Sequence, residues 1–309
     1  MSVYTPIHLQ QLQHFLNLYS LGRVLHYSGI QAGIENTNYR VTSSQGDFIV
    51  TIFESLSSEE LSSYLVLLNH LNKSDFPSPK PYICSENNFI NSLADKPAAV
   101  FNCLPGHSIE RPSIDQCTEI GQYLAQLHMT SQSSGFDKYN LKNIIGCQQV
   151  FNKIKENLSG RDVELLTSEL DFQLNYSVPD LPRGVIHADL FKDNVLFNKG
   201  SISAILDFYN ACNDCFLFDI AITCNDWCID NGAINQQKFK ALLSGYQSIR
   251  ILNDDEQKHL TFYLRLAALR FYLSRLEHQL NPKEGELVLK KDPLIFRSLL
   301  EYYRANSSD

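Results

Sequence analysis

GVIHADLFKDNVLF, residues 184–197, places a polar turn between two apolar runs. Each apolar run has the length and composition of a short buried strand. The turn carries His187, Asp189 and Asn194, and a second carboxylate, Asp207, stands at the end of the next short apolar run. The pattern therefore predicts that oxygen-bearing side chains gather where neighbouring strands end.

These residue types are the ones that kinase-type phosphoryl transfer requires. One carboxylate accepts the proton of the attacking hydroxyl, while an amide and a second carboxylate hold magnesium on the phosphates. Asp189 is the candidate base, and Asn194 and Asp207 are the candidate metal ligands. The spacing H-x-D-x-x-x-x-N is that of a kinase catalytic loop. The alternative is that Asp189 and Asn194 only cap a tight turn through local hydrogen bonds.

The composition of the chain favours a globular protein with a small-molecule partner. Its 309 residues are 44% hydrophobic and carry a formal net charge of −8. This charge gives no general reason to bind nucleic acid or an anionic membrane, since both require clustered Lys and Arg. Residues 1–6 lack the features of a secretory signal, and no apolar segment approaches the length of a membrane span. We expect a soluble, cytoplasmic protein.

Eight cysteines in such a chain are expected to be reduced thiols. Two pairs, Cys212 with Cys215 and Cys224 with Cys228, resemble a zinc site at first sight. The pairs are close together in sequence, and the second lies in a segment with helical periodicity, which disfavours zinc. Buried thiols that pack as small apolar groups are the preferred interpretation.

The first third of the chain predicts a small antiparallel sheet with two helices. Thr5 and Pro6 are typical of a helix start, and Gly22 would end that helix. Ser57 and Glu60 predict a capping box at the start of a second helix. Short β-like runs with turn residues between them predict strands over residues 24–30, 39–42, 48–53, 82–85 and 98–104.

Pro105 and Gly106 punctuate the chain and predict the boundary between two lobes, residues 1–104 and 105–309. The second lobe is predominantly helical, with helices predicted over residues 113–128, 148–158, 163–174, 216–228, 236–246, 256–279 and 293–303. The fold class predicted is α+β, protein-kinase-like and two-lobed.

In such a fold the loop between the first two strands covers the nucleotide phosphates, and small residues permit close approach of the backbone. The candidate nucleotide-binding residues are Gly33, Asn36, Thr37 and Asn38 in that loop and Phe101, Asn102 and Cys103 at the hinge. An ordinary turn-rich loop has a similar composition.

Several motifs together resemble bacterial homoserine kinase, in the form built on the aminoglycoside-phosphotransferase or choline-kinase fold. They are residues 2–6, 33–39, 184–197, 206–214, 219–221, 225–228, 268–271 and 291–294, which spread the likeness over nearly the whole chain. The resemblance implies ATP- and Mg²⁺-dependent phosphorylation of the side-chain hydroxyl of L-homoserine, giving O-phospho-L-homoserine for threonine biosynthesis. It agrees with Asp189 as base and with Asn194 and Asp207 on magnesium. His187 would hold the loop by hydrogen bonds, or be a satisfied core residue.

The chain departs from this pattern at two positions. Kinase-like lobes commonly carry a phosphate-binding lysine on the third strand, whereas Thr51 stands near that place. Loop amides, magnesium and Arg40 are candidates to meet the phosphate charge, although an exposed, solvated strand arginine is the simpler interpretation of Arg40. Lys192 stands where the family has proline, and it would reach a phosphate or remain a solvated loop lysine.

Homoserine carries an ammonium and a carboxylate, so its pocket requires an acidic group for one and a cation or amides for the other. The candidate substrate-binding residues are Tyr209, Asp214, Asn225, Asp226 and Trp227, with Arg270 and Arg275 as carboxylate partners. Helix-surface arginines more often pair with nearby acids. Two rival functions remain open: another hydroxyl kinase of this fold, acting on choline, an aminoglycoside or a sugar, and a non-catalytic nucleotide-binding protein.

Overall fold

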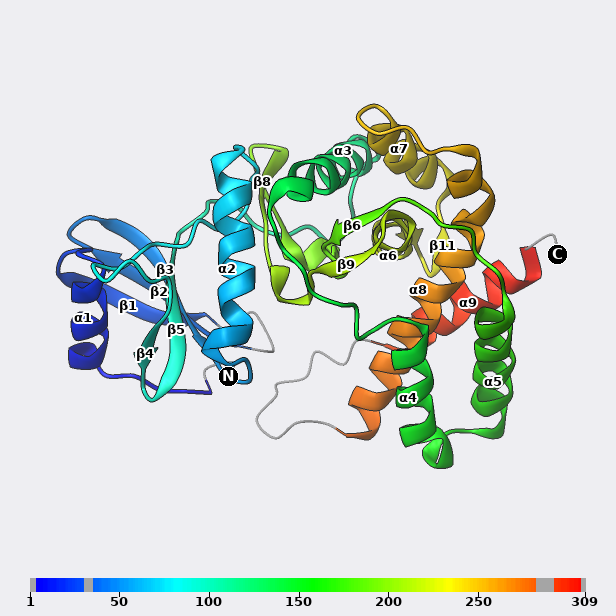
Figure 1. The fold of residues 1–309 in the computed structure, drawn as a ribbon, viewed down its shortest axis with the longest axis horizontal. Helices are drawn as coiled ribbons and strands as arrows, with labels where there is room; N and C mark the ends of the chain where they lie inside the picture. The colour runs from blue at the N-terminus through cyan, green and yellow to red at the C-terminus, as the bar shows by residue number, and fades with distance from the viewer. Residues whose placement is uncertain (1–3, 31–35, 282–291, 307–309) are drawn as a thin grey trace.

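A five-stranded antiparallel sheet forms the N-terminal part of the molecule. In the computed structural model, which describes residues 4–30, 36–281 and 292–306, the strand order is β1-β2-β3-β5-β4 (Figure 1). The bounds are β1 Val24–Ile30, β2 Asn36–Ser43, β3 Gly46–Phe53, β4 Asn91–Leu93 and β5 Lys96–Asn102. The strands predicted near residues 24–30, 39–42, 48–53 and 98–104 are confirmed. The strand predicted over residues 82–85 is wrong, because Pro81 forms only an isolated bridge to Phe101 and the edge of the sheet is β4 instead.

Helix α1 (Leu9–Leu18) covers the outer face of the sheet (Figure 1). Its Leu12 and Phe15 lie in one apolar cluster with Val50 and Ile52, which alternate along β3. The helix begins later than the predicted start at Thr5. Thr5 instead joins the sheet: its hydroxyl donates to Glu54 Oε1 at 2.9 Å and its main-chain N–H donates to the Thr37 hydroxyl at 3.1 Å.

Helix α2 (Ser58–Lys73) stands between the inner face of the sheet and the C-terminal part (Figure 1). The predicted capping box is confirmed, with Ser57 and Glu60 bonded reciprocally. The leucines of α2 lie in one large apolar cluster with Phe53 and Phe101 of the sheet and with the helices of the C-terminal part. The sheet thus contributes to two apolar cores, one on each face.

The C-terminal part is mainly helical, as predicted. Its helices are α3 Ile114–Thr130, α4 Ile144–Ile154, α5 Gly160–Asn175, α6 Phe216–Trp227, α7 Gln236–Gln247, α8 Asp254–Leu280 and α9 Leu294–Asn306. Short antiparallel strand pairs lie among them: β6 Arg183–Ile186 with β9 Cys212–Cys215, β7 Val195–Asn198 with β8 Ser201–Ile205, and β10 Ile229–Asp230 with β11 Ala233–Ile234. A division at residue 104 stays a prediction, since β5 ends at Asn102 and α3 begins at Ile114.

Two glycines allow α3 and α7 to pack backbone to backbone. A Cβ atom at Gly121 would lie 2.1 Å from the Leu242 carbonyl oxygen, and one at Gly245 would lie 2.0 Å from that of Thr118. No side chain larger than hydrogen fits at such distances. This close contact brings Tyr246 of α7 within hydrogen-bond distance of His128 of α3.

Seven of the eight cysteines are buried, and Cys103 is half-buried. The preferred interpretation, buried reduced thiols, is confirmed for those seven. Among the described residues no cluster of three or more His, Cys, Asp or Glu side chains is arranged to hold a metal ion. Every helix in that part of the chain is too short or too polar to cross a lipid bilayer.

Candidate active site

The predicted catalytic loop connects β6 to β7 and brings its key residues together. Asp189, Asn194 and Asp207 are all half-buried. The main-chain N–H of Leu206 donates to the Asn194 carbonyl at 2.8 Å, and the ring of His187 contacts the Leu206 carbonyl at 2.8 Å. These contacts place Asp207, the next residue after Leu206, beside the loop that carries the other two.

The side chains of Asn194 and Asp207 offer oxygen atoms that fit a hard divalent cation. The Asn194 amide nitrogen donates to the Asp189 carbonyl at 2.9 Å, so Oδ1 is the atom that this amide can present to a metal. Asp207 lies in the left-handed region at φ 60° and ψ 59°, an unusual conformation for a residue other than glycine. One amide and one carboxylate, completed by phosphate oxygens, are the ligands that Mg²⁺ prefers at phosphate sites.

His187 is fully buried and uses both ring nitrogens. Burial lowers the pKa of His187, so the ring is neutral near pH 7. Nε2 donates to the Leu206 carbonyl, because a carbonyl only accepts, and Nδ1 then accepts the main-chain N–H of Asp189 at 3.3 Å. His187 therefore positions the loop and links it to the Asp207 segment.

Asp219, in the first turn of α6, anchors the same loop by hydrogen bonds to its main chain. Its two carboxylate oxygens accept the main-chain N–H groups of His187 and Ala188 at 2.7 and 2.8 Å. Its Oδ2 also lies 3.0 Å from Nε2 of His128, whose Nδ1 lies 2.8 Å from the Tyr246 hydroxyl. Asp219 and His128 are both completely buried.

The charge state of this pair follows from its environment. Burial raises the pKa of Asp219, but hydrogen bonds and charges from His128 and His187 outweigh it, and the pKa ends below its usual value. Burial lowers the pKa of His128 and outweighs the opposing effect of Asp219. Asp219 is thus an anion that accepts from a neutral His128. Sequence reasoning assigned neither residue to the site: Asp219 was noted only within the motif 219–221, and His128 only as the end of a predicted helix.

Arg270 holds the same loop through a main-chain carbonyl. It is 5% exposed, and its NH1 donates to the Ala188 carbonyl at 2.8 Å. Ala188 has a φ of 62°, a conformation that a bonded carbonyl helps to fix. The guanidinium also lies over the Phe271 ring, 4.6 Å from its centroid. These contacts give Arg270 a positioning role, and its binding of a substrate carboxylate stays a prediction.

Two predicted substrate residues have structural roles in the core instead. Asn225 is 1% exposed, donating to the Leu264 carbonyl at 3.0 Å and accepting from the Tyr303 hydroxyl at 2.8 Å. Trp227 is completely buried, with Nε1 bonded to the Leu190 carbonyl at 3.0 Å. The prediction that they line a substrate pocket is corrected on these grounds, since their polar atoms are already engaged within the protein.

The C-terminal half of the predicted catalytic loop carries Lys192, while Asp226 and Arg275 are predicted substrate residues. Asp226 Oδ2 accepts the main-chain N–H of Lys192 at 2.8 Å, and its Oδ1 lies 3.9 Å from Lys192 Nζ. Arg275 NH1 donates to the Asp292 carbonyl at 2.8 Å and the guanidinium lies 4.2 Å from the centroid of Phe296. Lys192 therefore pairs with an acid in this structure, and contact with a phosphate stays a prediction.

Tyr209 connects the Asp207 segment to the N-terminal lobe. Its ring packs edge-on against Phe53 of β3 and Tyr64 of α2, with centroids 5.1 and 6.0 Å apart. A substrate contact of Tyr209 stays a prediction, as does one of Asp214. The carboxylate of Asp214 holds neighbouring protein groups, Arg183 at 3.2 Å and Asn140 at 2.6 Å.

On the sheet, polar side chains occupy the place where a kinase-like lobe carries its lysine. Thr51 donates to Asn38 Oδ1 at 2.7 Å across β3 and β2. Asn36 Oδ1 accepts the main-chain N–H of Glu54 at 3.4 Å, and the buried Thr37 hydroxyl contacts Glu54, so both serve the sheet itself. Gly33 lies outside the described residues. The roles of this group in nucleotide binding stay predictions.

Two further contacts bear on the nucleotide side. Arg40 is exposed and forms an ion pair with Asp47 at 2.9 Å, in agreement with the simpler interpretation. At the hinge, the main-chain N–H of Asn102 donates to the Lys80 carbonyl at 3.2 Å. Phe101 is buried and Cys103 is half-buried. Main-chain contact of Phe101, Asn102 or Cys103 with an adenine stays a prediction.

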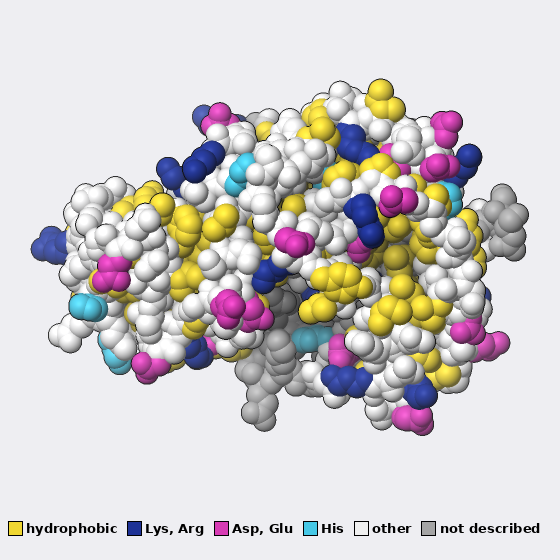
Figure 2. Space-filling view, in the orientation of Figure 1, with side chains coloured by type: hydrophobic (Ala, Val, Ile, Leu, Met, Phe, Trp, Pro, Cys, Tyr) yellow, Lys and Arg dark blue, Asp and Glu magenta, His cyan; other side chains and the backbone are white. Residues whose placement is uncertain are grey.

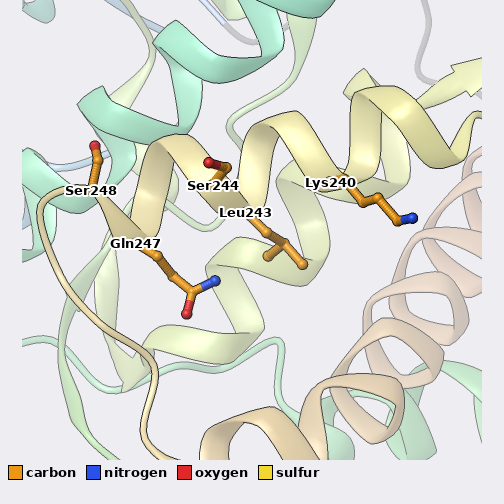
Figure 3. Close-up of a pocket in the computed structure, with 5 residues that line it drawn as sticks. All are labelled: Lys240, Leu243, Ser244, Gln247 and Ser248. Carbon is orange, nitrogen blue, oxygen red and sulfur yellow. The ribbon is translucent and has the colours of Figure 1, made fainter.

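Two hollows on the surface lie elsewhere. One, of about 560 Å³, is lined by Lys240, Leu243, Ser244, Gln247 and Ser248 of α7 and its end (Figure 3). The other, of about 750 Å³, lies between α2 and the β4–β5 edge and is lined partly by Ser62, Asn91 and Lys96. Neither is lined by the catalytic loop. Figure 2 shows charged side chains of both signs spread over the visible face of the molecule, some of them near the junction between the two lobes.

Comparison with known proteins agrees with this geometry. Residues 26–252 match the family described as phosphotransferase enzyme family. The homoserine kinase of Methylobacillus flagellatus is 38% identical over 303 residues, covering 98% of this chain and 95% of that protein. The homoserine kinase of Azorhizobium caulinodans is 36% identical over 313 residues, covering 100% and 98%.

Solved structures resemble the fold at low sequence identity. An amicoumacin kinase in complex with AMP-PNP, Ca²⁺ and its ligand has a TM-score of 0.71 at 17% identity, covering 95% of this chain and 93% of that one. Choline kinase from Cryptosporidium parvum has a TM-score of 0.64 at 13% identity, covering 91% and 88%. The kinase-like two-lobed fold predicted from the sequence is thereby confirmed.

Proposed function

Because the chain belongs to the phosphotransferase enzyme family, among the homoserine kinases, we propose that it transfers the γ-phosphate of ATP to the side-chain hydroxyl of L-homoserine. The product is O-phospho-L-homoserine, a precursor in threonine biosynthesis. The observation that supports this most directly is the fixed arrangement of Asp189, Asn194 and Asp207 beside one another, in a chain that matches homoserine kinases over nearly its full length.

Asp189 acts as the base. Its Oδ2 accepts a hydrogen bond from Asn210 Nδ2 at 3.3 Å, which orients the carboxylate, while His187 and Arg270 hold the N–H and the carbonyl of the peptide unit between Ala188 and Asp189. The carboxylate accepts the proton of the substrate hydroxyl as the hydroxyl oxygen attacks the γ-phosphorus, and the bond from that phosphorus to the bridging oxygen of ADP breaks, so that ADP leaves. Catalysis then rests on position and charge more than on covalent chemistry, as phosphoryl transfer does in general.

Asn194 and Asp207 would hold magnesium. When bound, the ion neutralises phosphate charge and orients the transferred group. The chain contributes two oxygen ligands. The hydrogen bond to the Asp189 carbonyl orients the side chain of Asn194, and the left-handed backbone conformation of Asp207 sets the direction of its side chain. The adenine would lie against the hinge near Cys103, and the phosphates would lie near the side chains of Asn38 and Thr51 on the sheet.

The substrate assignment is tested by ADP release from purified protein with L-homoserine, choline, kanamycin and methylthioribose, each supplied with ATP and Mg²⁺. We expect L-homoserine to give a kcat/KM at least about 100-fold above the others, the discrimination that a charged pocket can reach. Preference for another acceptor would assign the chain a different hydroxyl-kinase activity. No ADP release with any acceptor would favour a non-catalytic nucleotide-binding protein.

A further inference from the structure

The connection between α3 and α4 is bonded to β9, the strand that follows the Asp207 segment. Tyr139 forms a parallel bridge with Asn213 of β9. The main-chain N–H of Asn213 donates to the Lys138 carbonyl at 2.7 Å, and its side-chain amide donates to Asp137 Oδ1 at 2.9 Å. The connection is therefore held in register with the strand that follows the Asp207 segment.

Asp214 extends this attachment to the end of the connection. Its Oδ1 accepts from Arg183 at 3.2 Å and from the main-chain N–H of Cys215 at 2.7 Å. Its Oδ2 accepts from Asn140 Nδ2 at 2.6 Å, and Asn140 Oδ1 accepts the main-chain N–H of Lys142 at 2.8 Å. Asn140 is 4% exposed. A chain of buried and half-buried groups thus fixes where Lys142 leaves the backbone.

From that point the side chain of Lys142 reaches toward the catalytic base. Its Nζ donates to Asn210 Oδ1, and Asn210 Nδ2 donates to Asp189 Oδ2 at 3.3 Å. One carboxamide therefore separates the ammonium of Lys142 from the carboxylate of Asp189. Lys142 is exposed, so a substrate approaching Asp189 from solvent can meet its ammonium.

We propose that Lys142 binds the carboxylate of the amino-acid substrate and so selects amino-acid alcohols over simple amino alcohols. The inference rests on the proposed function. Only three carbons separate the hydroxyl of L-homoserine from its carboxylate carbon, so a hydroxyl placed on Asp189 leaves the carboxylate in the immediate neighbourhood of the base. An ammonium is a suitable partner for a carboxylate at that position.

Three arginines around the site are less well placed for this task. Arg270 is buried and holds the Ala188 carbonyl. Arg183 is paired with Asp214 on the far side of that carboxylate. Arg275 packs on Phe296 and donates to the Asp292 carbonyl. Lys142 alone of these four is joined to Asp189 through a single side chain.

The test compares L-homoserine with 3-aminopropan-1-ol, which is the same molecule without the carboxylate. Lys142→Met should raise KM for L-homoserine about 10- to 100-fold, as expected when a charge-assisted hydrogen bond is lost. If 3-aminopropan-1-ol is an acceptor, its kcat/KM should stay within about twofold of the value for the unsubstituted protein. If it only inhibits homoserine turnover competitively, its Ki should stay within the same range. Lys142→Arg should restore part of the homoserine affinity, because it restores the charge.

Lys155→Met, at an exposed lysine outside the site, is the matched control and should leave every constant unchanged. Thermal unfolding of each variant shows whether the fold is intact. An equal loss with both acceptors together with a raised KM for ATP would place Lys142 on the phosphates and overturn the inference, and so would unchanged constants in Lys142→Met. Failure of the proposed function would appear differently, as absence of homoserine-dependent ADP release from the unsubstituted protein.

Discussion

The carboxylate of Asp219 accepts the main-chain N–H groups of His187 and Ala188 at 2.7 and 2.8 Å, directly before Asp189, the proposed catalytic base. A single buried anion thus fixes the position of Asp189 without touching it. His128 completes the arrangement by donating to the same carboxylate at 3.0 Å.

Asp219→Asn should destabilise the protein and lower kcat. The amide lacks the charge that holds two main-chain N–H groups and His128, and loss of one partner in a buried charged network costs about 3–5 kcal/mol. Urea unfolding measures the change in free energy, and steady-state kinetics measure kcat. A variant with full stability and full kcat would show that the anchor is dispensable. Asp171→Asn, at an exposed position of α5, is the control.

The free energy of unfolding should fall as the pH drops below about 6.5, the ordinary pKa of histidine. The pKa of His128 is lowered in the folded state, so the unfolded chain binds a proton first and acid favours unfolding. Asp219, whose pKa is also lowered, acts in the same direction at lower pH. Urea unfolding at a series of pH values measures this slope. His187, whose pKa is likewise lowered by burial, contributes in the same range, so His128→Gln should flatten the slope between pH 6.5 and 5 only in part. An equally steep slope in this variant would rule out a contribution from His128.

Asp189→Asn should lower kcat at least about 100-fold, the lower range of what a general base contributes. The substitution preserves shape and should leave folding and ATP binding nearly unchanged. Steady-state ADP release measures kcat, and equilibrium titration measures nucleotide affinity. An active Asp189→Asn enzyme would remove this residue as the base.

Arg270→Met distinguishes positioning from substrate binding. Loss of the bond to the Ala188 carbonyl should cost about 1.5–3 kcal/mol in stability and lower kcat, with KM for L-homoserine nearly constant. A raised KM at unchanged kcat would instead support the earlier expectation of a carboxylate contact. Thermal unfolding and steady-state kinetics on the same preparation provide both readings.

Tyr209→Ala should weaken the contact between the lobes. The ring packs against Phe53 and Tyr64, and truncation of a large aromatic side chain costs about 3 kcal/mol. We expect lower stability and weaker ATP binding, measured by thermal unfolding and by titration. Tyr209→Phe keeps the ring and should behave like the unsubstituted protein. If the two variants behave alike, the ring contacts have no such effect.

The sequence indicates the catalytic loop because its residues are close in the chain and their types suit one chemistry. The helices of the C-terminal part and the capping box at Ser57 were predictable for a similar reason, as both depend on local pattern. The start of α1 was misplaced because the hydroxyl of Thr5 is bonded to Glu54, far away in sequence. A local rule has no access to such a partner.

The supporting groups of the site depend on contacts of this long-range kind. His128 and Asp219 are 91 residues apart, and Asn140 and Asp214 are 74 apart. Asn225 and Trp227 follow the catalytic segment closely, yet α6 turns them into the core, where no substrate reaches them. Closeness in sequence to the candidate catalytic residues was therefore a poor guide to the substrate-binding residues. The direction of α6 decides which of its side chains face the core.

The position of α2 has a consequence for how the chain folds. Its leucines belong to the same apolar core as the helices of the C-terminal part, and that core also includes Phe53 and Phe101 of the sheet. A fragment ending near residue 104 would expose the apolar face of α2 to solvent and would be prone to aggregate. The two lobes should accordingly melt together in one cooperative transition, although they are distinct in shape.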